Sequence, residues 1–362
     1  MRKKICFFTT VDWFILSHRS DLFEVFLASF DMTVVVFEDT GKLKKRWPKL
    51  NVIQLSSSRD GLSITDMMKS LVELKHIFKN SNFDVLYTVG VRAVFYALFI
   101  ERFRINVKYI YTISGLGSLF TAKDNFKYNL IQKVFYFLVK RSSALIIVQN
   151  IDDKNKFDSL GSKRVELILG SGVDLDKFRN NRIVRKIDKV VFVGRLLESK
   201  GIYDFISVAN YFKESDLEFQ IIGSIDNNVE SLTQKNIDDF PINISYLGYN
   251  DDVTKILNQA SLMILPSRRE GLSLSLCEAA SSGLPIITYN VPGCKEVCVN
   301  DYNGILCKPF LIIDIISAVE KLISNPDLVE EYSKNSRKHA ESNFDIKSIN
   351  NDLLKCVLNE CN

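Results

Sequence analysis

Short runs of β-branched and aromatic residues alternate along the chain with segments in which apolar residues recur at helical spacing. In the first half, these runs predict strands at residues 5–10, 33–37, 51–55, 85–89, 109–113 and 145–149. The segments between them predict helices at residues 21–30, 64–79, 92–103 and 126–141. Regular alternation of strands and helices is typical of βαβ units, in which helices join parallel strands.

The same alternation begins again after the stretch 170–179. Strands are expected at residues 189–193, 218–222, 242–247, 261–265, 285–288 and 304–307. Helices are expected at residues 202–212, 253–259, 275–282 and 312–324, with one more at about 344–362. We therefore expect an α/β protein with two doubly wound, Rossmann-like domains whose parallel sheets face an interdomain cleft. The first holds residues 1–168 and the last helix, and the second holds residues 169–343.

The composition narrows the class of protein without naming an activity. Hydrophobic residues make up 46% of the 362 residues and charged residues 25%, which excludes wholesale disorder and fibrous repeats. Seven cysteines without a CxxC pair, and only three histidines, predict reduced thiols and no metal site. The apolar run after the basic N-terminus contains Asp12, and the apolar stretch 85–100 contains Arg92. We expect neither a leader nor a membrane span, and a cytoplasmic location.

Charge is distributed unevenly between the two halves. Residues 1–150 carry 22 basic and 12 acidic residues, a balance of +10, and the remainder has a balance of −6. A basic half indicates an anionic partner such as a membrane surface, although a solvated lysine-rich face would have the same composition. Nucleic acid is not expected, because no nucleic-acid-binding motif accompanies the charge.

Two basic segments could contact a membrane. One is a cluster formed by Lys42, Lys44, Lys45, Arg46 and Lys49. The other is the predicted helix in 123–141, which mixes lysines with aromatic residues. Phe135 and Tyr136, with the lysines near them, are expected to lie on an anionic membrane. The alternative is a core helix whose polar face happens to be basic.

Candidate chemistry lies where two strands of the second half end. After the strand at 261–265, a loop contains Glu270 and Gly271, and a helix that includes Glu278 follows. Free N–H groups at a helix start bind anions, so carboxylates beside them suit a ligand with both hydroxyls and phosphates. After the strand at 189–193, Arg195 and Lys200 bracket a turn where a diphosphate could bind. The alternative is that both are surface charges.

These motifs resemble those of a known enzyme family. The resemblance rests on Glu270 and Glu278 with seven residues between them, on Gly194-Arg195 followed by Lys200-Gly201, and on the segment 170–178. In this order and spacing they resemble the retaining family-4 glycosyltransferases of GT-B fold, over nearly the whole chain. The segments 11–19 and 112–120 look like the branch that extends undecaprenyl-diphosphate-linked sugars. That branch includes N-acetylgalactosaminyltransferases of O-antigen, capsule and N-glycan assembly.

The resemblance implies a role for each matching residue. Arg195 and Lys200, next to Gly194, would bind the donor diphosphate and stabilise the departing UDP. Glu270 would contact hydroxyls of the donor sugar, and Glu278 would bind the ribose. Backbone amides in the stretch Gly271, Leu272, Ser273, Leu274 and Ser275 would hold sugar and phosphate oxygens. No metal or other cofactor is implied, since UDP-sugar is a substrate.

Other residues are expected on the acceptor side. His18 and Arg19 follow the first strand and could bind a phosphate or sugar of the acceptor, or His18 could be a packed helix-start residue. Many family members have a histidine where this chain has Ser114, followed by Gly115, so a histidine role is not carried over. Ser273-Leu274 replaces a Pro-Lys pair that is frequent in the branch, which leaves the donor sugar open.

The expected function is therefore transfer of an N-acetylhexosamine, for example GalNAc, or of a hexose from a UDP-sugar to an undecaprenyl-diphosphate-linked saccharide. The expected setting is bacterial O-antigen or capsule synthesis, peripherally on the inner face of the cell membrane. A sugar-nucleotide 2-epimerase shares the architecture and is the alternative enzyme. A non-catalytic saccharide-binding partner in an assembly complex is the alternative outside the enzymes.

Overall fold

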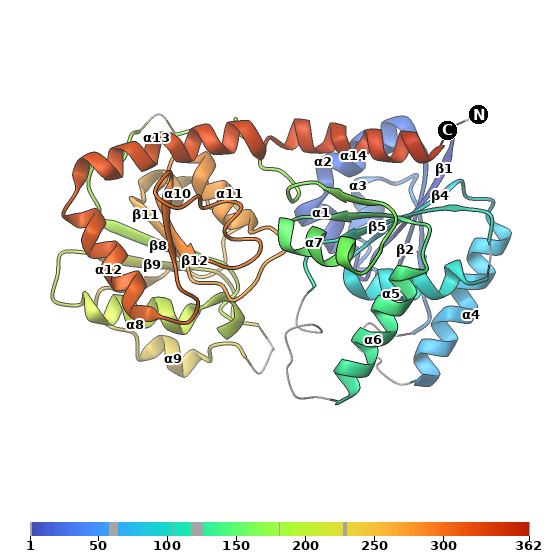
Figure 1. The fold of residues 1–362 in the computed structure, drawn as a ribbon, viewed down its shortest axis with the longest axis horizontal. Helices are drawn as coiled ribbons and strands as arrows, with labels where there is room; N and C mark the ends of the chain where they lie inside the picture. Colours follow the sequence, from blue (N-terminus) through green and yellow to red (C-terminus); the bar gives the residue numbers. More distant parts are fainter. Residues whose placement is uncertain are drawn as a thin grey trace. The chain divides into compact units, whose positions relative to one another are not determined.

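The computed structural model describes residues 2–57, 64–103, 105–116, 126–180, 182–226 and 230–361. The chain forms two compact units (Figure 1). The first unit holds Met1–Ser171 and Ser348–Asn362, and the second holds Gly172–Lys347. The chain thus passes from one unit to the other twice, close to both boundaries expected from the sequence.

The first unit is built on a parallel sheet of seven strands in the order β3-β2-β1-β4-β5-β6-β7. Its strands are β1 Lys4–Phe8, β2 Asp31–Val36, β3 Asn51–Gln54, β4 Val85–Val89, β5 Lys108–Ile113, β6 Leu145–Val148 and β7 Val165–Leu167. All five residues of the central strand β4 are buried, as expected for a parallel sheet covered on both faces.

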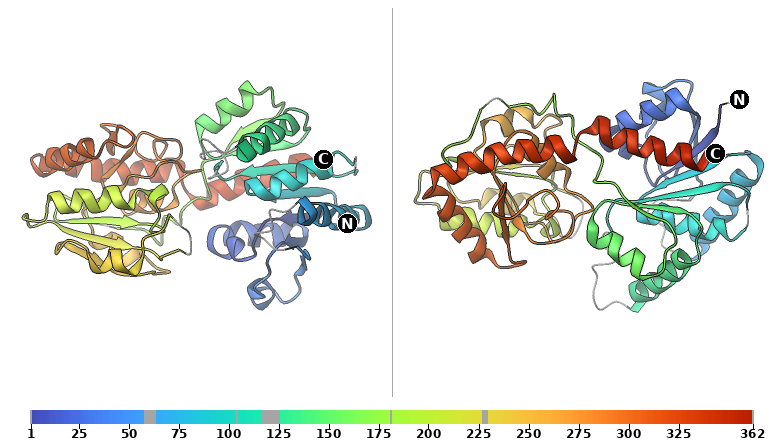
Figure 2. Two further views of the ribbon diagram at one scale, coloured as in Figure 1. Left: turned by 90° about the horizontal axis from the view of Figure 1, so that it is seen from below. Right: turned by 45° about the horizontal axis from the view of Figure 1, so that its top comes forward.

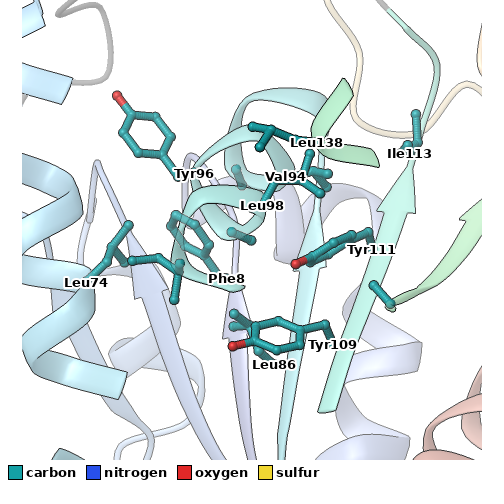
Figure 3. Packing of buried hydrophobic residues seen from close by; sticks show 14 of the residues in the cluster. Phe8, Leu74, Leu86, Val94, Tyr96, Leu98, Tyr109, Tyr111, Ile113 and Leu138 are labelled. Carbon is teal, nitrogen blue, oxygen red and sulfur yellow. The ribbon is translucent and has the colours of Figure 1, made fainter. Parts of the chain in front are cut away.

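Helices cover both faces of this sheet (Figure 2). The unit contains α1 Trp13–His18, α2 Ser20–Ser29, α3 Lys42–Arg46, α4 Ile64–Asn80, α5 Val91–Glu101, α6 Phe126–Lys140, α7 Ile151–Ser159 and α14 Ile346–Cys361. Side chains of α4, α5 and α6 pack on one face, as Figure 3 shows for Leu74, Val94 and Leu138. Residues of α2 and the C-terminal helix α14 pack on the other face.

The second unit contains a parallel sheet of six strands in the order β10-β9-β8-β11-β12-β13. The strands are β8 Lys189–Val193, β9 Glu218–Ile222, β10 Ile244–Tyr246, β11 Leu262–Leu265, β12 Ile286–Tyr289 and β13 Gly304–Cys307. Its helices are α8 Ile202–Tyr211, α9 Gln234–Asp238, α10 Thr254–Gln259, α11 Leu274–Ser281, α12 Ile312–Ile323 and α13 Pro326–Asn343. Helices α8 and α12 contact each other, and α11 contacts α13.

The structure confirms the predicted fold class of two parallel α/β sheets, and β8, β9 and β13 have the bounds expected from the sequence. Sequence periodicity did not reveal β7, the long helix α13 or the shorter helices α1, α3, α7 and α9. β7 has only three residues, none of them fully buried. α13 is rich in charged and polar residues, so its apolar stripe is narrow.

The structure corrects one expectation about the basic helix α6. Phe135 is fully buried in the core of the first unit, and the hydroxyl of Tyr136 is buried too. Helical spacing cannot tell a core aromatic from a membrane-facing one, because both recur at the same period. Among the residues of α6 whose side chains are described, the exposed apolar ones are Leu130 and Phe137. Of the lysines expected to help, Lys123 and the side chain of Lys127 lie outside the described residues.

Candidate active site

The candidate site lies where strand order reverses in the second unit. From β8 the chain continues to β9 and β10 on one side, and it then returns to β11, which pairs with β8. The loops after the neighbouring strands β8 and β11 diverge to opposite sides of the sheet. Doubly wound sheets bind ligands at such a point. The loop after β8 contains Arg195 and Lys200, and the loop after β11 contains Glu270.

These two loops are linked through their backbones. The N–H of Arg268 donates to the carbonyl of Ser199 at 2.9 Å, and the hydroxyl oxygen of Ser267 lies 3.2 Å from the same carbonyl. Gly201 has a positive φ of 76°, and a Cβ there would lie 2.0 Å from the carbonyl oxygen of Pro266. Only glycine fits this position, so Gly201 allows the loop of Lys200 to approach the loop of Glu270.

The loop after β12 holds Glu270 from the opposite side. The N–H of Glu270 donates to the carbonyl of Pro292 at 3.0 Å, and that of Ser273 donates to Gly293 at 2.9 Å. Gly293 has a φ of 79°, and a Cβ there would lie 2.6 Å from Glu270. Loops from three adjacent strands therefore fix the backbone around Glu270.

The two charged groups expected to contact the donor meet in this site. The Lys200 ammonium Nζ lies 2.5 and 2.6 Å from Oε1 and Oε2 of Glu270. The Ser267 hydroxyl donates to Oε1 of Glu270 at 2.8 Å. The lysine side chain is 23% exposed and the glutamate side chain 11%. The pair is therefore largely shielded from water, and its attraction is stronger than that of a surface pair.

Arg195 is held differently. Its guanidinium Nη1 contacts Oδ2 of Asp226 at 3.0 Å, and its side chain is 59% exposed. An exposed pair of this kind is weak, because water screens both charges. Gly194 continues from β8, and its N–H donates to the carbonyl of Ile222.

Helix α11 begins beside Glu270. Ser273 is its N-cap residue, and its hydroxyl accepts from the N–H of Leu276 at 3.4 Å. The sequence suggested that the amide of Ser273 would hold a ligand oxygen. In the structure this N–H already donates to the carbonyl of Gly293, so it is not free for a ligand. Leu274 and Ser275 form the first turn, where N–H groups have no acceptor within the helix. Gly271 is buried and Leu272 half-buried.

Glu278 lies one turn further along α11. Burial raises its pKa to about 7, an effect opposed by the positive charge of Lys177 and strengthened by Asp252. Lys177 itself forms an ion pair with Asp252, with Nζ and Oδ1 3.5 Å apart. No ion pair of Glu278 is found within the part of the chain that the structure describes.

The acceptor-side candidates belong to the first unit. Arg19 is only 3% exposed, and its Nη1 donates to the carbonyl of Gly170 at 3.4 Å. Burial lowers the pKa of this guanidinium. Ser114 and Gly115 follow β5 and are half-buried. His18 ends α1, but its side chain lies outside the described residues, as do positions 117–120 of the branch-specific segment.

Sequence reasoning missed Ser267 and Arg268, although both lie in the same loop as Glu270. The guanidinium of Arg268 lies 4.5 Å from the ring centre of Phe310 and 3.6 Å from the Glu198 carboxylate. Arg268 therefore reaches the turn that carries Lys200. Arg268 and Glu198 are 70 positions apart, and a single sequence does not show that such residues are in contact. Only their closeness to Glu270 in the sequence could have pointed to Ser267 and Arg268.

The Asp174-Leu-Asp176 segment forms a turn. The Asp174 carboxylate accepts from the N–H groups of Asp176 and Lys177, both at 2.9 Å. Across the described residues, no cluster of three or more His, Cys, Asp or Glu side chains could hold a metal ion.

Profiles of known families match residues of both units. The profile of the glycosyl transferases group 1 matches residues 174–339, and that of the glycosyl transferase 4-like family matches residues 4–150. The chain belongs to the family-4 glycosyltransferases of GT-B fold. The family expected from the motifs is thereby confirmed. The loops after β8 and β11 lie within the residues that the group 1 profile matches.

Similar proteins include enzymes that act on lipid-linked sugars. The N,N'-diacetylbacillosaminyl-diphospho-undecaprenol α-1,3-N-acetylgalactosaminyltransferase of Campylobacter jejuni is 26% identical, with 86% of each chain aligned. The UDP-Gal:α-D-GlcNAc-diphosphoundecaprenol α-1,3-galactosyltransferase of Escherichia coli is 26% identical, over 79% of this chain and 78% of that enzyme.

Solved structures confirm the GT-B fold. Sucrose-phosphate synthase from Thermosynechococcus elongatus has a TM-score of 0.81 at 16% identity, with 99% of each chain aligned. Anabaena HepE, solved in complex with UDP and glucose, has a TM-score of 0.77 at 15% identity, over 99% of this chain and all of the other. Searching the described residues, we find no helix long and apolar enough to cross a bilayer.

Proposed function

We propose that this glycosyltransferase moves a sugar from a UDP-sugar to an undecaprenyl-diphosphate-linked saccharide in bacterial surface polysaccharide synthesis. The transferred sugar is an N-acetylhexosamine, for example GalNAc, or a hexose. Support comes from the relatives named for transfer to undecaprenol-linked sugars and from a Staphylococcus aureus capsular polysaccharide glycosyltransferase, 26% identical over 91% of this chain and 92% of that protein. The observation that carries the donor half of the proposal is the contact of Lys200 with Glu270 at the switch point.

The donor would be held by groups from two loops. The diphosphate would bind to Lys200 and Arg195, and the first turn of α11 would offer N–H groups to phosphate and sugar oxygens. Glu270 would accept hydrogen bonds from sugar hydroxyls, and Glu278 from the ribose. Because negative charge grows on the diphosphate as the glycosidic bond breaks, cations placed there stabilise the transition state more than the ground state.

Retention of configuration fits the chemistry of the site. Glu270 is already occupied by Lys200 and Ser267, which suits a carboxylate that binds and orients a ligand rather than one that attacks carbon. We propose that the acceptor hydroxyl attacks from the face that the UDP leaves and transfers its proton to the departing phosphate. The sugar carbon then carries oxocarbenium character, as in glycoside hydrolysis. No metal or cofactor takes part in this proposal.

We propose peripheral binding to the inner face of the cell membrane through α4 and α6. The exposed apolar side chains described on these helices include Met68 and Val72 on α4, and Leu130 and Phe137 on α6. Arg141 lies 3.8 Å from the centre of the Phe137 ring, so a cation accompanies an exposed aromatic there. Exposed apolar side chains next to basic ones suit the interface of an anionic membrane.

A first experiment measures UDP release from UDP-glucose, UDP-galactose, UDP-GlcNAc and UDP-GalNAc, with and without undecaprenyl-diphosphate-linked glycolipid. Release that requires one sugar and the lipid is expected, and it names the donor. Conversion of the sugar nucleotide without lipid would replace the proposal by the epimerase. Saccharide binding with no release across the panel would favour the non-catalytic partner.

A second experiment tests the membrane surface by sedimentation with vesicles of phosphatidylglycerol and phosphatidylethanolamine. The double variant Val72→Ser, Phe137→Ser is expected to lose most vesicle binding, because both side chains are more than half exposed. Phe310→Ser in the second unit, 59% exposed, is the matched control and is expected to bind like the wild type. Equal binding of the double variant would contradict this part of the proposal.

A further inference from the structure

In the structure, the cation expected to meet the donor diphosphate is already neutralised. Lys200 contacts both carboxylate oxygens of Glu270, at 2.5 and 2.6 Å. The carboxylate is also bonded by Ser267, and its backbone is fixed by Pro292. An incoming diphosphate must therefore compete with a carboxylate that is held in place. Competition of this kind weakens binding by the free energy needed to break the pair.

A nucleoside diphosphate and a nucleotide-sugar differ in the hydrogen bonds that they can offer to Glu270 after Lys200 has turned to the diphosphate. A nucleoside diphosphate can take Lys200, but it leaves Glu270, which is 11% exposed, without its counter-charge. An uncompensated carboxylate in such a setting is unfavourable, because little water reaches it. A nucleotide-sugar also takes Lys200, but its sugar hydroxyls can donate to Glu270. Only the intact donor can replace both halves of the pair.

We propose that the Lys200–Glu270 pair makes the site discriminate the intact nucleotide-sugar from the nucleoside diphosphate that the reaction releases. The inference rests on the proposed function, since it takes a nucleotide-sugar as the donor. After transfer the sugar is lost from Glu270, and the pair re-forms as the nucleoside diphosphate leaves. The same two residues thus bind the donor and favour release of the product.

Arg195 provides an internal comparison. Its pair with Asp226 joins side chains that are 59% and 32% exposed, and water can solvate Asp226 when the arginine turns to a phosphate. Little discrimination is expected from this exposed pair. The effect is assigned to the shielded pair alone.

The test measures UDP binding by calorimetry in the wild type, Glu270→Gln and Asp226→Asn. Glutamine keeps the shape of Glu270 and can accept from Ser267, but it leaves the charge of Lys200 uncompensated. We expect Glu270→Gln to bind UDP about three- to tenfold more tightly than the wild type. Asp226→Asn is expected to change UDP affinity by less than about twofold, because its pair is exposed.

The second measurement is the ratio of UDP to UDP-sugar dissociation constants, using the donor named by the release assay. The ratio is expected to fall in Glu270→Gln, because UDP binding improves and sugar binding does not. UDP affinity in folded Glu270→Gln that equals or falls below that of the wild type would overturn the inference and leave the proposed function standing. If Glu270→Gln does not fold, Glu270→Ala carries the same expectation. Failure of the wild type and the variant to bind UDP, ADP or GDP would contradict the proposed function as well.

Discussion

Lys200 in the second unit and Arg19 in the first are both shielded from water, but they are held in different ways. Lys200 has a full counter-charge, with both oxygens of Glu270 within 2.6 Å. Arg19 is 3% exposed, and its contact with the Gly170 carbonyl at 3.4 Å is long for a hydrogen bond. The Nε of Arg19 has no hydrogen-bond partner among the described residues.

The contrast separates a cation that has a carboxylate partner from a buried cation that has none among the described residues. Removing one member of a shielded pair leaves the other uncompensated, which destabilises a protein strongly. Replacing a buried charge that lacks a partner by an apolar side chain removes a desolvation penalty instead. The free energy of unfolding should therefore change in opposite directions when each of the two cations is replaced by the same apolar residue.

The largest expected effect is on Lys200→Met. Loss of the cation that faces the leaving diphosphate should lower kcat/KM for transfer by about 10²- to 10³-fold. Transfer from the identified UDP-sugar to glycolipid is the measurement, with circular dichroism to verify folding. Lys321→Met removes an exposed cation of the same unit that pairs with Asp301, and it should stay within about twofold of the wild type. Equal activity of the two variants would break the comparison.

The next effect concerns the contact that brings Lys200 to its partner. Gly201→Ala should lower the free energy of unfolding by about 2–4 kcal/mol, because its Cβ would meet the Pro266 carbonyl and its φ is positive. Gly248 has a similar φ of 70°, but open space surrounds it. Gly248→Ala should therefore lose only about 1 kcal/mol. Urea unfolding of both variants gives the difference, and equal losses would show that the close approach has no energetic weight.

The third prediction concerns Glu278, a shielded carboxyl group in the second unit that has no ion pair among the described residues. Its folded-state pKa of about 7 exceeds the ordinary value of 4.5, so the folded protein binds its proton more tightly than the unfolded chain. Stability from this group is therefore present below pH 4.5 and is lost as the pH rises toward 7. Relative to Glu278→Gln, the wild type should lose about 3 kcal/mol of its free energy of unfolding between pH 4 and pH 8.

The control for this titration is Glu341→Gln, which removes a carboxylate that is 53% exposed on α13. Urea unfolding at several pH values should give this variant the same pH profile as the wild type. A wild-type profile parallel to that of Glu278→Gln would show that Glu278 does not titrate in this range.

The smallest expected effect is on Arg19→Met. Stability should change by less than about 1 kcal/mol or should increase, since a buried charge that pairs with no carboxylate of the described residues is replaced by an apolar chain of similar length. UDP affinity should be unchanged, because Arg19 belongs to the other unit. A loss above about 2 kcal/mol in urea unfolding would contradict this. If lipid-dependent transfer falls while stability holds, the acceptor role predicted for Arg19 gains direct support.

Much of the site could be predicted from local pattern. The strands β8 and β11 are largely apolar runs, and the helical spacing after them indicates crossover helices, so Lys200 and Glu270 were expected at strand ends. The partners of these side chains could not be predicted. Ser267 and Arg268 show no periodic or motif signal, and their contacts to the loop of Lys200 depend on β8 lying beside β11.

The sequence by itself determined most of the order of strands and helices, the fold class and the family, because apolar periodicity and motif spacing are local properties of the chain. Only the tertiary structure decided that Lys200 is neutralised by Glu270, that Phe135 is in the core and that Arg19 is buried. Each of these depends on which strands are neighbours and on which face of a helix meets the sheet. Both are set by packing between segments far apart in the sequence, where the local pattern carries no information.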